Sequence, residues 1–407
     1  MAGTYSTSTD GTSDSDVLEN VDISGCTESA PLQAFQTPCS YTGETTTLTS
    51  LTPVTGTVAS GSDSGNFVST SSIQDFYSPQ PTFNIAQTSG VAWQGALSQA
   101  GGGSELIAMP TSGGNAVLPS ILFAVSPMTG GSAASISGSF QIFSIGTNVQ
   151  INSPPYPGSC ANAGTAGDEG ILEAATFDGA GNMAGAQESV NCWNANTMTG
   201  GIFQSTTCPH ATYTLDASGN MTLTYTSAAC SGQQPSVLSG YTFTGAYNGT
   251  AFVLTNADPS GPRILLVGIA QSPGSSKCGN GSPLNPTVSG GSAIWATVAL
   301  SYNSSALAGL TFSNSSSGPY PFSINGGTLN TGGAISTTSS AGPFSYTIDG
   351  NCFITIARQN VNSVQLDRSL GVVDTGASVL ALEDFDTSGG GPVLTIGVRV
   401  ENLVQLN

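Results

Sequence analysis

Acidic side chains are the residues of this sequence best able to do chemistry, because bases and soft metal ligands are scarce. The chain holds 24 Asp and Glu residues against five Lys and Arg residues and a single histidine, His210. Its clearest motif is Asp374-Thr375-Gly376, which follows two valines and precedes Ala377-Ser378. This is the form of an aspartic-protease loop, a reaction that requires two carboxylates sharing one proton across a cleft. No second loop of this kind occurs in an apolar setting, since Asp386-Thr387-Ser388-Gly389 lies in a polar turn, so we interpret Asp374 as a turn residue.

Two further acidic clusters could supply the paired carboxylates of a glycosidase, which lie about 5–9 Å apart across the sugar. The clusters are Asp168, Glu169, Glu173 and Asp178, and separately Glu383, Asp384 and Asp386. Asp178 and Asp386 fall in turn sequences, so solvated turn positions are the simpler interpretation. The carboxylates of Glu383, Asp384 and Asp386 also suit Ca²⁺, the one cofactor that the sequence leads us to consider.

Trp193 and Asn194 are the best candidates for ligand binding. A tryptophan in a polar, Asn-rich stretch can offer a stacking surface to a sugar ring. Trp193 also follows Cys192, so packing over a disulfide explains it equally well. Trp295 lies in an alternating strand-like run, and we assign it to the core.

The eight cysteines favour disulfides in an oxidising compartment. No two of them form a Cys-x-x-Cys pair, and a single histidine leaves zinc without its usual ligands. The cysteines are Cys26, Cys39, Cys160, Cys192, Cys208, Cys230, Cys278 and Cys352. Spacing alone fixes no connectivity, and our working assignment pairs each cysteine with its neighbour in the chain, Cys26 with Cys39 and so on to Cys278 with Cys352.

The charge balance excludes several classes of partner. The formal net charge is −19, which repels phosphate backbones and anionic headgroups, so we expect no nucleic-acid partner. Charged residues are only 7% of the chain, and few carboxylates have a cation to pair with, which favours tolerance of acid. No apolar run is long enough for a membrane-spanning helix. The first residues lack the basic and apolar regions of a signal peptide, so we expect the numbering to start at a mature N-terminus.

A repeated three-strand meander organises the chain. It is clearest in residues 241–272, where an Asn-Gly turn and a Pro/Gly turn separate three strand-like runs. Residues 370–400 show the same layout, with Asp374-Thr375-Gly376 at the position of the Asn248-Gly249 turn. A looser copy covers residues 93–127. The motif that resembles a protease loop therefore occupies an ordinary turn of the repeat.

Two hairpins precede the meander in the middle of the chain. They turn at Asp178-Gly179-Ala180-Gly181 and at Asp216-Ala217-Ser218-Gly219, where Gly supplies positive φ and Asp caps the turn. Near the C-terminus, FSINGGTLNTGG and FSYTIDGNCFITIA repeat this pair. We therefore predict an all-β protein of about three tandem antiparallel barrel-like or sandwich-like modules, arranged as beads and joined by Gly/Ser/Pro linkers. The predicted divisions are a polar tail at 1–22 and modules at 23–130, 133–273 and 290–407.

The paired signature of Asp-Gly-x-Gly-Asn, then Tyr-x-x-Asp-x-x-Gly-Asn, then a meander resembles the Gly-rich, lipocalin-like repeat modules of secreted bacterial proteins. It covers the second module well, the third moderately and the first weakly. The resemblance implies an extracellular, barrel-like fold. It brings no catalytic residues, because that group has no assigned activity.

Because the sequence assembles no catalytic set, we expect a protein that is not an enzyme. The leading interpretation is an extracellular structural or adhesive protein of the cell surface, such as a filament or envelope subunit. Copies would form a homo-oligomer or polymer by edge-strand pairing, with residues 1–22 and Leu394 to Leu406 as candidate edges. The alternative is a secreted glycan-binding or glycan-processing protein with surface glycans as partners and Trp193 in its site.

Overall fold

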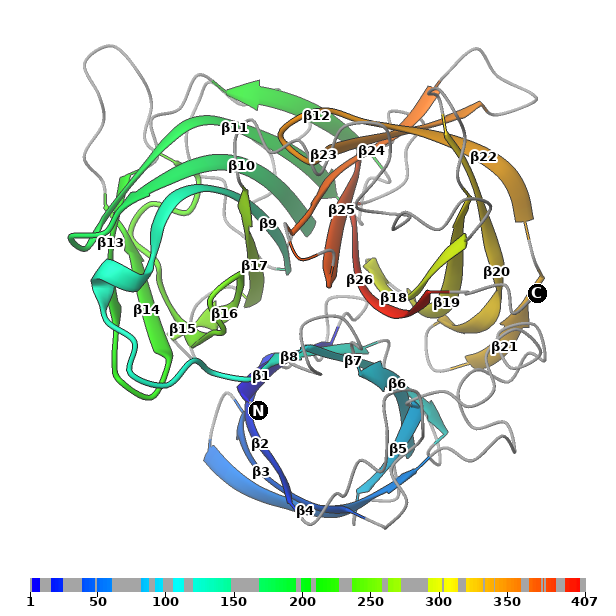
Figure 1. The fold of residues 1–407 in the computed structure, drawn as a ribbon, viewed down its shortest axis with the longest axis horizontal. Coiled ribbons are helices and arrows are strands. Elements are labelled where there is room, and N and C mark those ends of the chain that lie inside the picture. The colour runs from blue at the N-terminus through cyan, green and yellow to red at the C-terminus, as the bar shows by residue number, and fades with distance from the viewer. Residues whose placement is uncertain are drawn as a thin grey trace.

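The structure of the protein is a computed structural model, and nearly all of its elements are β-strands. It describes residues 2–7, 16–24, 39–47, 50–60, 82–87, 92–97, 105–112, 120–147, 168–194, 199–205, 210–226, 236–257, 263–271, 292–301, 304–313, 320–331, 334–339, 341–359, 366–374, 376, 378–385 and 392–402. The described strands form three closed antiparallel barrels, seen end-on in Figure 1. The predicted all-β class of tandem modules is confirmed, with barrels rather than sandwiches. Within these ranges, no helix has the length and hydropathy of a membrane span.

Barrel 1 consists of eight strands that pair in chain order and close where the last meets the first. They are β1 (Ala2–Thr7), β2 (Asp16–Ser24), β3 (Cys39–Thr47), β4 (Ser50–Ser60), β5 (Thr82–Gln87), β6 (Ala92–Leu97), β7 (Glu105–Ser112) and β8 (Ser120–Val125). Residues 1–22, which the composition assigned to a polar tail, instead contribute β1 and most of β2. Their β-forming residues pair in register, with Tyr5 opposite Val17 and Leu122.

Barrel 2 is also an eight-stranded ring, and it carries a ninth strand outside the ring. Its strands are β9 (Ser137–Thr147), β10 (Asp168–Asp178), β11 (Asn182–Asn194), β12 (Thr199–Ser205), β13 (His210–Leu215), β14 (Asn220–Tyr225), β15 (Thr242–Tyr247), β16 (Ala251–Asn256) and β17 (Arg263–Gln271). The ring closes because β9 pairs with both β10 and β17. Strand β11 pairs with β10, β12 and β13, so β12 is the additional strand.

Barrel 3 repeats this order strand for strand. Its strands are β18 (Ser292–Ser301), β19 (Ser304–Ser313), β20 (Tyr320–Thr331), β21 (Ala334–Thr338), β22 (Ala341–Ile348), β23 (Phe353–Gln359), β24 (Leu366–Val373), β25 (Val379–Phe385) and β26 (Val393–Asn402). Strand β18 closes the ring by pairing with β19 and β26, and β21 is the additional strand on β20. The described strands of the three barrels thus fall in residues 2–125, 137–271 and 292–402. The division into modules at 23–130, 133–273 and 290–407 stays a prediction.

The turn chemistry of the sequence identifies most of the hairpins. β10 ends at Asp178 and β11 starts at Asn182, with positive φ of 73° at Gly179 and 101° at Gly181. The Asp216 turn between β13 and β14 and the predicted hairpin of β22 and β23 also lie where expected. The prediction of a hairpin within FSINGGTLNTGG is wrong. Its residues run through β20 as one strand, and Gly326 is the extra residue of a bulge, because Ala308 pairs with Gly327 and Gly309 with Asn325.

Neither edge strand predicted from the sequence has a free edge. β1 lies between β2 and β8, and β26 lies between β18 and β25. Closing each sheet into a ring uses the backbone groups on both sides of these strands. The prediction that residues 1–22 and Leu394 to Leu406 offer free edges for strand addition is therefore wrong for the strands described within these ranges.

The interior of barrel 2 is filled by aromatic and aliphatic side chains at alternating strand positions. Phe140 and Phe177 meet with ring centroids 4.8 Å apart, and Phe252 lies 5.8 Å from Phe140 and 5.9 Å from Phe177. Tyr213 contacts Phe177 and donates a hydrogen bond of 2.7 Å to the Ile136 carbonyl at one end of the barrel. A small barrel packed in this way has a solid core.

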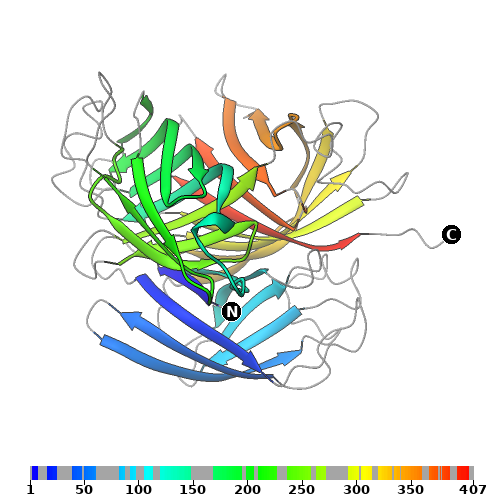
Figure 2. The ribbon, with the colours of Figure 1, turned by 60° about the vertical axis from the view of Figure 1, so that its left-hand side comes forward.

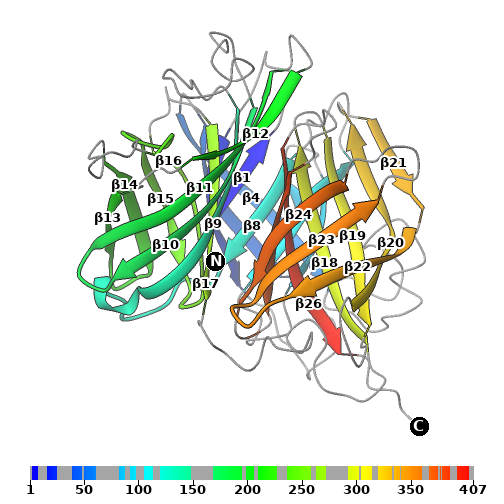
Figure 3. The same ribbon diagram turned by 90° about the horizontal axis from the view of Figure 1, so that it is seen from above.

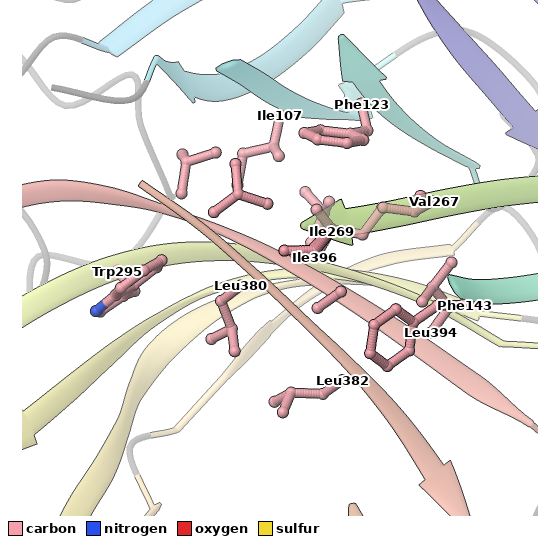
Figure 4. Packing of buried hydrophobic residues seen from close by; sticks show 14 of the residues in the cluster. Ile107, Phe123, Phe143, Val267, Ile269, Trp295, Leu380, Leu382, Leu394 and Ile396 are labelled. Atoms are coloured by element: carbon pink, nitrogen blue, oxygen red, sulfur yellow. The ribbon is translucent and has the colours of Figure 1, made fainter. Parts of the chain in front are cut away.

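A second apolar core joins the three barrels (Figure 4). Ile107 and Phe123 come from barrel 1, Phe143 and Ile269 from barrel 2, and Ile396 from barrel 3, and all of them are buried. The barrels therefore pack side by side, and the expected arrangement as beads is corrected (Figures 1 and 3). The strands that form this junction are apolar on both faces: β16 and β17 turn Phe252 and Leu266 into their barrel and Val253 and Val267 toward the neighbours.

The connection from barrel 1 to barrel 2 is held against the protein and extends between the two barrels in Figure 2. The Met128 amide donates to the Tyr247 carbonyl at 2.9 Å, and the Gly130 amide donates to the Ala217 carbonyl at 2.8 Å. A Cβ at Gly219 would lie 2.6 Å from the Met128 carbonyl oxygen. This linker is thus part of the packed structure.

Candidate functional site

Asp374 lies in the turn between β24 and β25 and is only 1% exposed. Its carboxylate accepts hydrogen bonds from the Ser378 amide at 2.6 Å, the Val379 amide at 2.7 Å, the Ser378 hydroxyl at 2.8 Å and the Gly376 amide at 3.1 Å. Burial raises the pKa of Asp374 above its ordinary value, against the lowering effect of these hydrogen bonds. All four donors belong to the turn itself, so the carboxylate closes the loop.

Asn248 does the same work in the matching turn of barrel 2. Its side-chain oxygen accepts from the Ala251 amide at 2.8 Å and the Thr250 amide at 3.0 Å. The backbone N–H of Asn248 donates to the Ala251 carbonyl, just as the backbone N–H of Asp374 donates to the Val379 carbonyl. The Asp-Thr-Gly motif therefore forms a turn, as interpreted from the sequence, at the position of the Asn248 turn. A protease would in addition need a second carboxylate that shares a proton with Asp374.

The hairpin aspartates are also turn residues. Asp178 accepts from the Asn182 amide at 2.9 Å and from the Asn182 side chain at 2.7 Å. Asp216 repeats both bonds with Asn220, at 2.9 and 2.8 Å. The side-chain amide of each asparagine is the main cause that lowers the pKa of the aspartate below its ordinary value. These hydrogen bonds stabilise the ionised form of both aspartates, which therefore carry no proton to donate near neutral pH.

Glu173 forms a buried carboxyl pair inside barrel 2. It lies directly opposite Glu188 on the neighbouring strand, and neither side chain is exposed. The Tyr225 hydroxyl donates to Glu173 Oε2 at 2.8 Å, and the Ser236 hydroxyl donates to Glu188 Oε1 at 2.7 Å. Oε1 of Glu173 has no hydrogen-bond partner among the residues that the structure describes. Burial first, and the charge of Glu188 second, raise the pKa of Glu173 well above its ordinary value.

Glu173 and Glu188 are the residue types of a glycosidase site, but both are buried, so a sugar cannot reach them. A glycosidase holds its two carboxylates on either side of a sugar in an open cleft. Glu173 and Glu188 face a packed interior, where Tyr225 is buried and Ser236 lies over Glu188. Carboxyl groups this close share a proton more readily than they ionise together. The arrangement can hold a proton and has no surface from which to act on a sugar.

Glu383 occupies the junction between barrels 2 and 3. It is 0% exposed, neither of its carboxylate oxygens has a hydrogen-bond partner among the described residues, and Gly170 of β10 lies against it. The Asn191 side chain donates across the same junction to the Asp384 carbonyl at 2.9 Å. Burial first, and the charge of Asp384 second, raise the pKa of Glu383 well above its ordinary value.

The predicted Ca²⁺ ligands are only partly described. Glu383 and Asp384 are consecutive strand residues, so their side chains leave on opposite faces of β25. Asp386 lies outside the described residues, so its position relative to Glu383 and Asp384 is not described. Where side chains are described, no three His, Cys, Asp or Glu residues gather into a metal-binding group. The Ca²⁺ site stays a prediction.

The predicted ligand-binding residues are placed by their backbone alone. Trp193 pairs with Asp168 and Gly200, and Asn194 pairs with Thr199, at the end of β11. Their side chains lie outside the described ones, so the predicted sugar-stacking surface is untested. Cys352 is buried, and the pairings of the other cysteines concern side chains that are not described. Trp295 is fully buried beside Phe312, as expected for a core residue.

Sequence reasoning missed Glu188, Tyr225 and Glu105. Glu105 is 1% exposed and accepts a hydrogen bond of 2.7 Å from the Asn248 side chain, which links barrels 1 and 2. A signal was present for Glu188, because it occupies the same alternation phase as the buried Val190. A carboxylate in the apolar phase of a strand predicts a buried acid.

Comparisons with known proteins give a weak resemblance. No protein-family model matches the sequence, and no curated protein matches it. A double mutant of transferrin binding protein B from Haemophilus parasuis Hp5 is 10% identical, with a TM-score of 0.24 over 96% of this chain and 66% of that chain. Intact Ap-TbpB is 9% identical, with a TM-score of 0.24 over 74% and 84% of the two chains. Isotype 1 of the protein from serogroup B Neisseria meningitidis is 8% identical, with a TM-score of 0.23 over 74% and 85%.

This chain thus spans just under two thirds of the first of these structures. The TM-scores show that the backbones do not superpose closely. A relationship to the Gly-rich repeat modules stays a prediction.

Proposed function

We propose that this chain is a non-enzymatic structural protein of the extracellular space or cell surface whose copies assemble with one another. One observation supports this above all: most of the described carboxylates that the sequence offers for catalysis are hydrogen-bonded within turns or buried within the fold. Asp178, Asp216 and Asp374 cap turns, Glu173 faces a solid barrel core, and Glu383 lies between two barrels. An active site needs a reactive group that can reach its substrate.

The body of the protein suits a structural role. Its barrels share an apolar core, and the linker at Met128 is hydrogen-bonded to barrel 2. Rigid subunits lose little conformational freedom when they associate. Burial raises the pKa of Glu173 and of Glu383, so these groups favour the folded state most in acidic surroundings.

Imaging of the purified full-length chain tests the proposal. We expect negative-stain micrographs and sedimentation velocity to show assemblies that grow with protein concentration. Panels of peptide and glycoside substrates should give no turnover. Particles that stay single at all concentrations and bind a polysaccharide array would instead support the glycan-binding alternative, and Trp193→Ala would then abolish that binding. Turnover that is lost in Glu173→Gln or Asp374→Asn would overturn the non-enzymatic assignment.

A further inference from the structure

Among the described strands, only β12 and β21, which lie outside the eight-stranded rings, have an edge that is not paired with another strand. β21 pairs with β20 alone, and β12 pairs with β11 alone, whereas the other described strands are paired on both sides. The two strands occupy the same position in barrels 3 and 2. A free edge presents a row of N–H and C=O groups that another strand can bind.

The edge of β21 lacks the features that usually prevent strand pairing. Its sequence, AISTT, has no charge and no proline, and its pairing with β20 from Thr331 opposite Ala334 to Gly327 opposite Thr338 contains no bulge. Natural edge strands are commonly protected by Lys, Pro or a bulge. Ile335 is 40% exposed, and among the described residues it is the one large apolar side chain that is exposed. The β-branched Ile335, Thr337 and Thr338 suit a further strand beside them.

The charge distribution indicates what would occupy this edge. No Asp, Glu, Lys, Arg or His occurs between Cys278 and Ile348, a range that includes β18 to β22. The whole chain nevertheless carries a net charge of −19, so two copies repel each other wherever their acidic surfaces meet. The neutral side of barrel 3 is where a second copy can approach without that repulsion. A basic partner would instead be attracted to the acidic surfaces.

We propose that β21 of one molecule pairs antiparallel with β21 of a second copy of this chain. This inference rests on the proposed function and names the surface through which copies meet. A two-fold arrangement centred on Ser336 sets Ile335 opposite Thr337 of the other copy, a favourable cross-strand combination. The pairing is isologous and by itself gives a dimer. The second free edge, β12, makes each molecule bivalent, so dimers extend into an open polymer.

Two charged variants separate this edge from a general effect of charge. Ile335→Glu with Thr337→Glu adds two negative charges to β21. The matched control, Thr212→Glu with Thr214→Glu, adds the same charge at exposed positions of β13, which is paired with β11 and β14. Because β12 can still link two copies, we expect the β21 variant to require at least about tenfold more protein to grow beyond a dimer, and the control to assemble as the unmodified chain does.

Hydrogen exchange on the unmodified chain gives an independent readout. Amides of residues 334–338 should exchange more slowly in assembled than in dilute protein, because the free edge becomes paired. Equal melting temperatures would show that both variants fold. If the β21 variant assembles normally, or if these amides exchange at one rate at all concentrations, the edge assignment is wrong while self-assembly stands. If the unmodified chain stays monomeric up to about 1 mM, both the edge and the proposed self-assembly fail.

Discussion

Barrels 2 and 3 have the same strand order and bury different polar groups. Each is a ring of eight strands with a ninth strand at the same position. Barrel 2 encloses the carboxyl pair of Glu173 and Glu188, whereas the buried polar residues of barrel 3 include Thr328 and Asn330, and its buried Glu383 faces the neighbouring barrel. Strand order therefore depends on turns and alternation, which both barrels keep, and leaves the buried polar positions free to differ.

The matching turns of the two barrels show the same contrast at smaller scale. Asn248 and Asp374 both cap the turn before the second strand of the meander. The barrel 2 turn uses a neutral amide, and the barrel 3 turn uses a carboxylate that is almost fully buried. Cys352 adopts a φ of 65° where Gly219 has 82° in the equivalent turn of barrel 2. The fold thus requires the conformation of these turns and tolerates more than one residue for achieving it.

Removing the turn caps should affect barrel 3 more than barrel 2. Asp374→Ala leaves the buried amides of Ser378 and Val379 without an acceptor, and we expect a loss of about 3–4 kcal/mol in the free energy of unfolding. Asn248→Ala removes a less buried cap and should cost about 1–2 kcal/mol. Denaturant titration of both variants measures the difference. Equal losses would show that burial of the Asp374 carboxylate does not matter.

Replacing Asp374 by Asn sharpens the same contrast. The amide keeps one oxygen acceptor and loses the other, so the loss should be intermediate. Any peptidase activity of the preparation should be unaffected by this change.

The two Asp-capped turns differ in how they accept a methyl group. Gly219→Ala places a Cβ 2.6 Å from the Met128 carbonyl oxygen and strains a φ of 82°, so we expect a loss of about 2–3 kcal/mol. A control in the barrel 3 turn is Gly350→Ala, at the position that Ala217 occupies in barrel 2, where nothing lies within 4 Å of the added Cβ. That change should alter stability by no more than about 0.5 kcal/mol. A neutral Gly219→Ala would mean that the linker at Met128 moves away freely.

The buried acids predict a stability that decreases with rising pH. The pKa of Glu173 and of Glu383 lies well above the ordinary value of 4.5, so the folded state binds more protons than the unfolded state. Their contribution is complete below pH 4.5 and is lost as pH rises through the folded pKa values. Glu383→Gln should raise the free energy of unfolding at pH 8 by about 1 kcal/mol and leave it unchanged at pH 4.

Surface carboxylates provide the opposite control. The lowered pKa of Asp178 means that its contribution is present above its ordinary pKa of 3.8 and is lost as pH falls through the folded value. Glu383→Gln and Asp178→Asn should therefore flatten opposite ends of the profile of melting temperature against pH. A profile that falls toward acid from neutral pH, with no effect of Glu383→Gln, would contradict the assignment of Glu383 as a buried acid with a raised pKa.

The sequence predicted the strands and turns better than the packing of the three barrels against one another. The Asp178 and Asp216 hairpins and the match of Asp374 to Asn248 follow from local turn chemistry, which acts over a few residues. Strand β2 was missed although Val21 and Ile23 alternate, because acidic residues among them suggested a solvated tail. The packing of the barrels was also missed. Its signal was the unbroken apolar runs of β16 and β17, since a strand that faces solvent on one side would alternate.

The carboxyl pair could not be predicted, because it depends on register. Glu173 and Glu188 meet only through the pairing of β10 with β11, and a bulge beside Ala174 and Ala175 sets which residues face each other. A shift of one residue would direct one of the two carboxylates out of the barrel. Local sequence carries no information on such a bulge, whereas the apolar phase in which Glu173 lies was readable.

The pairing of the first and last strands of each ring has a consequence for biosynthesis. β1 meets β8, β9 meets β17, and β18 meets β26, so no ring can close until its final strand has left the ribosome. Contacts this distant along the chain slow folding, and the nascent rings stay open meanwhile. Those final strands also carry Phe123, Val267 and Ile396 to the junction. We therefore expect each ring that closes to complete the docking face for the next one, so that the rings fold in order from the N-terminus during synthesis.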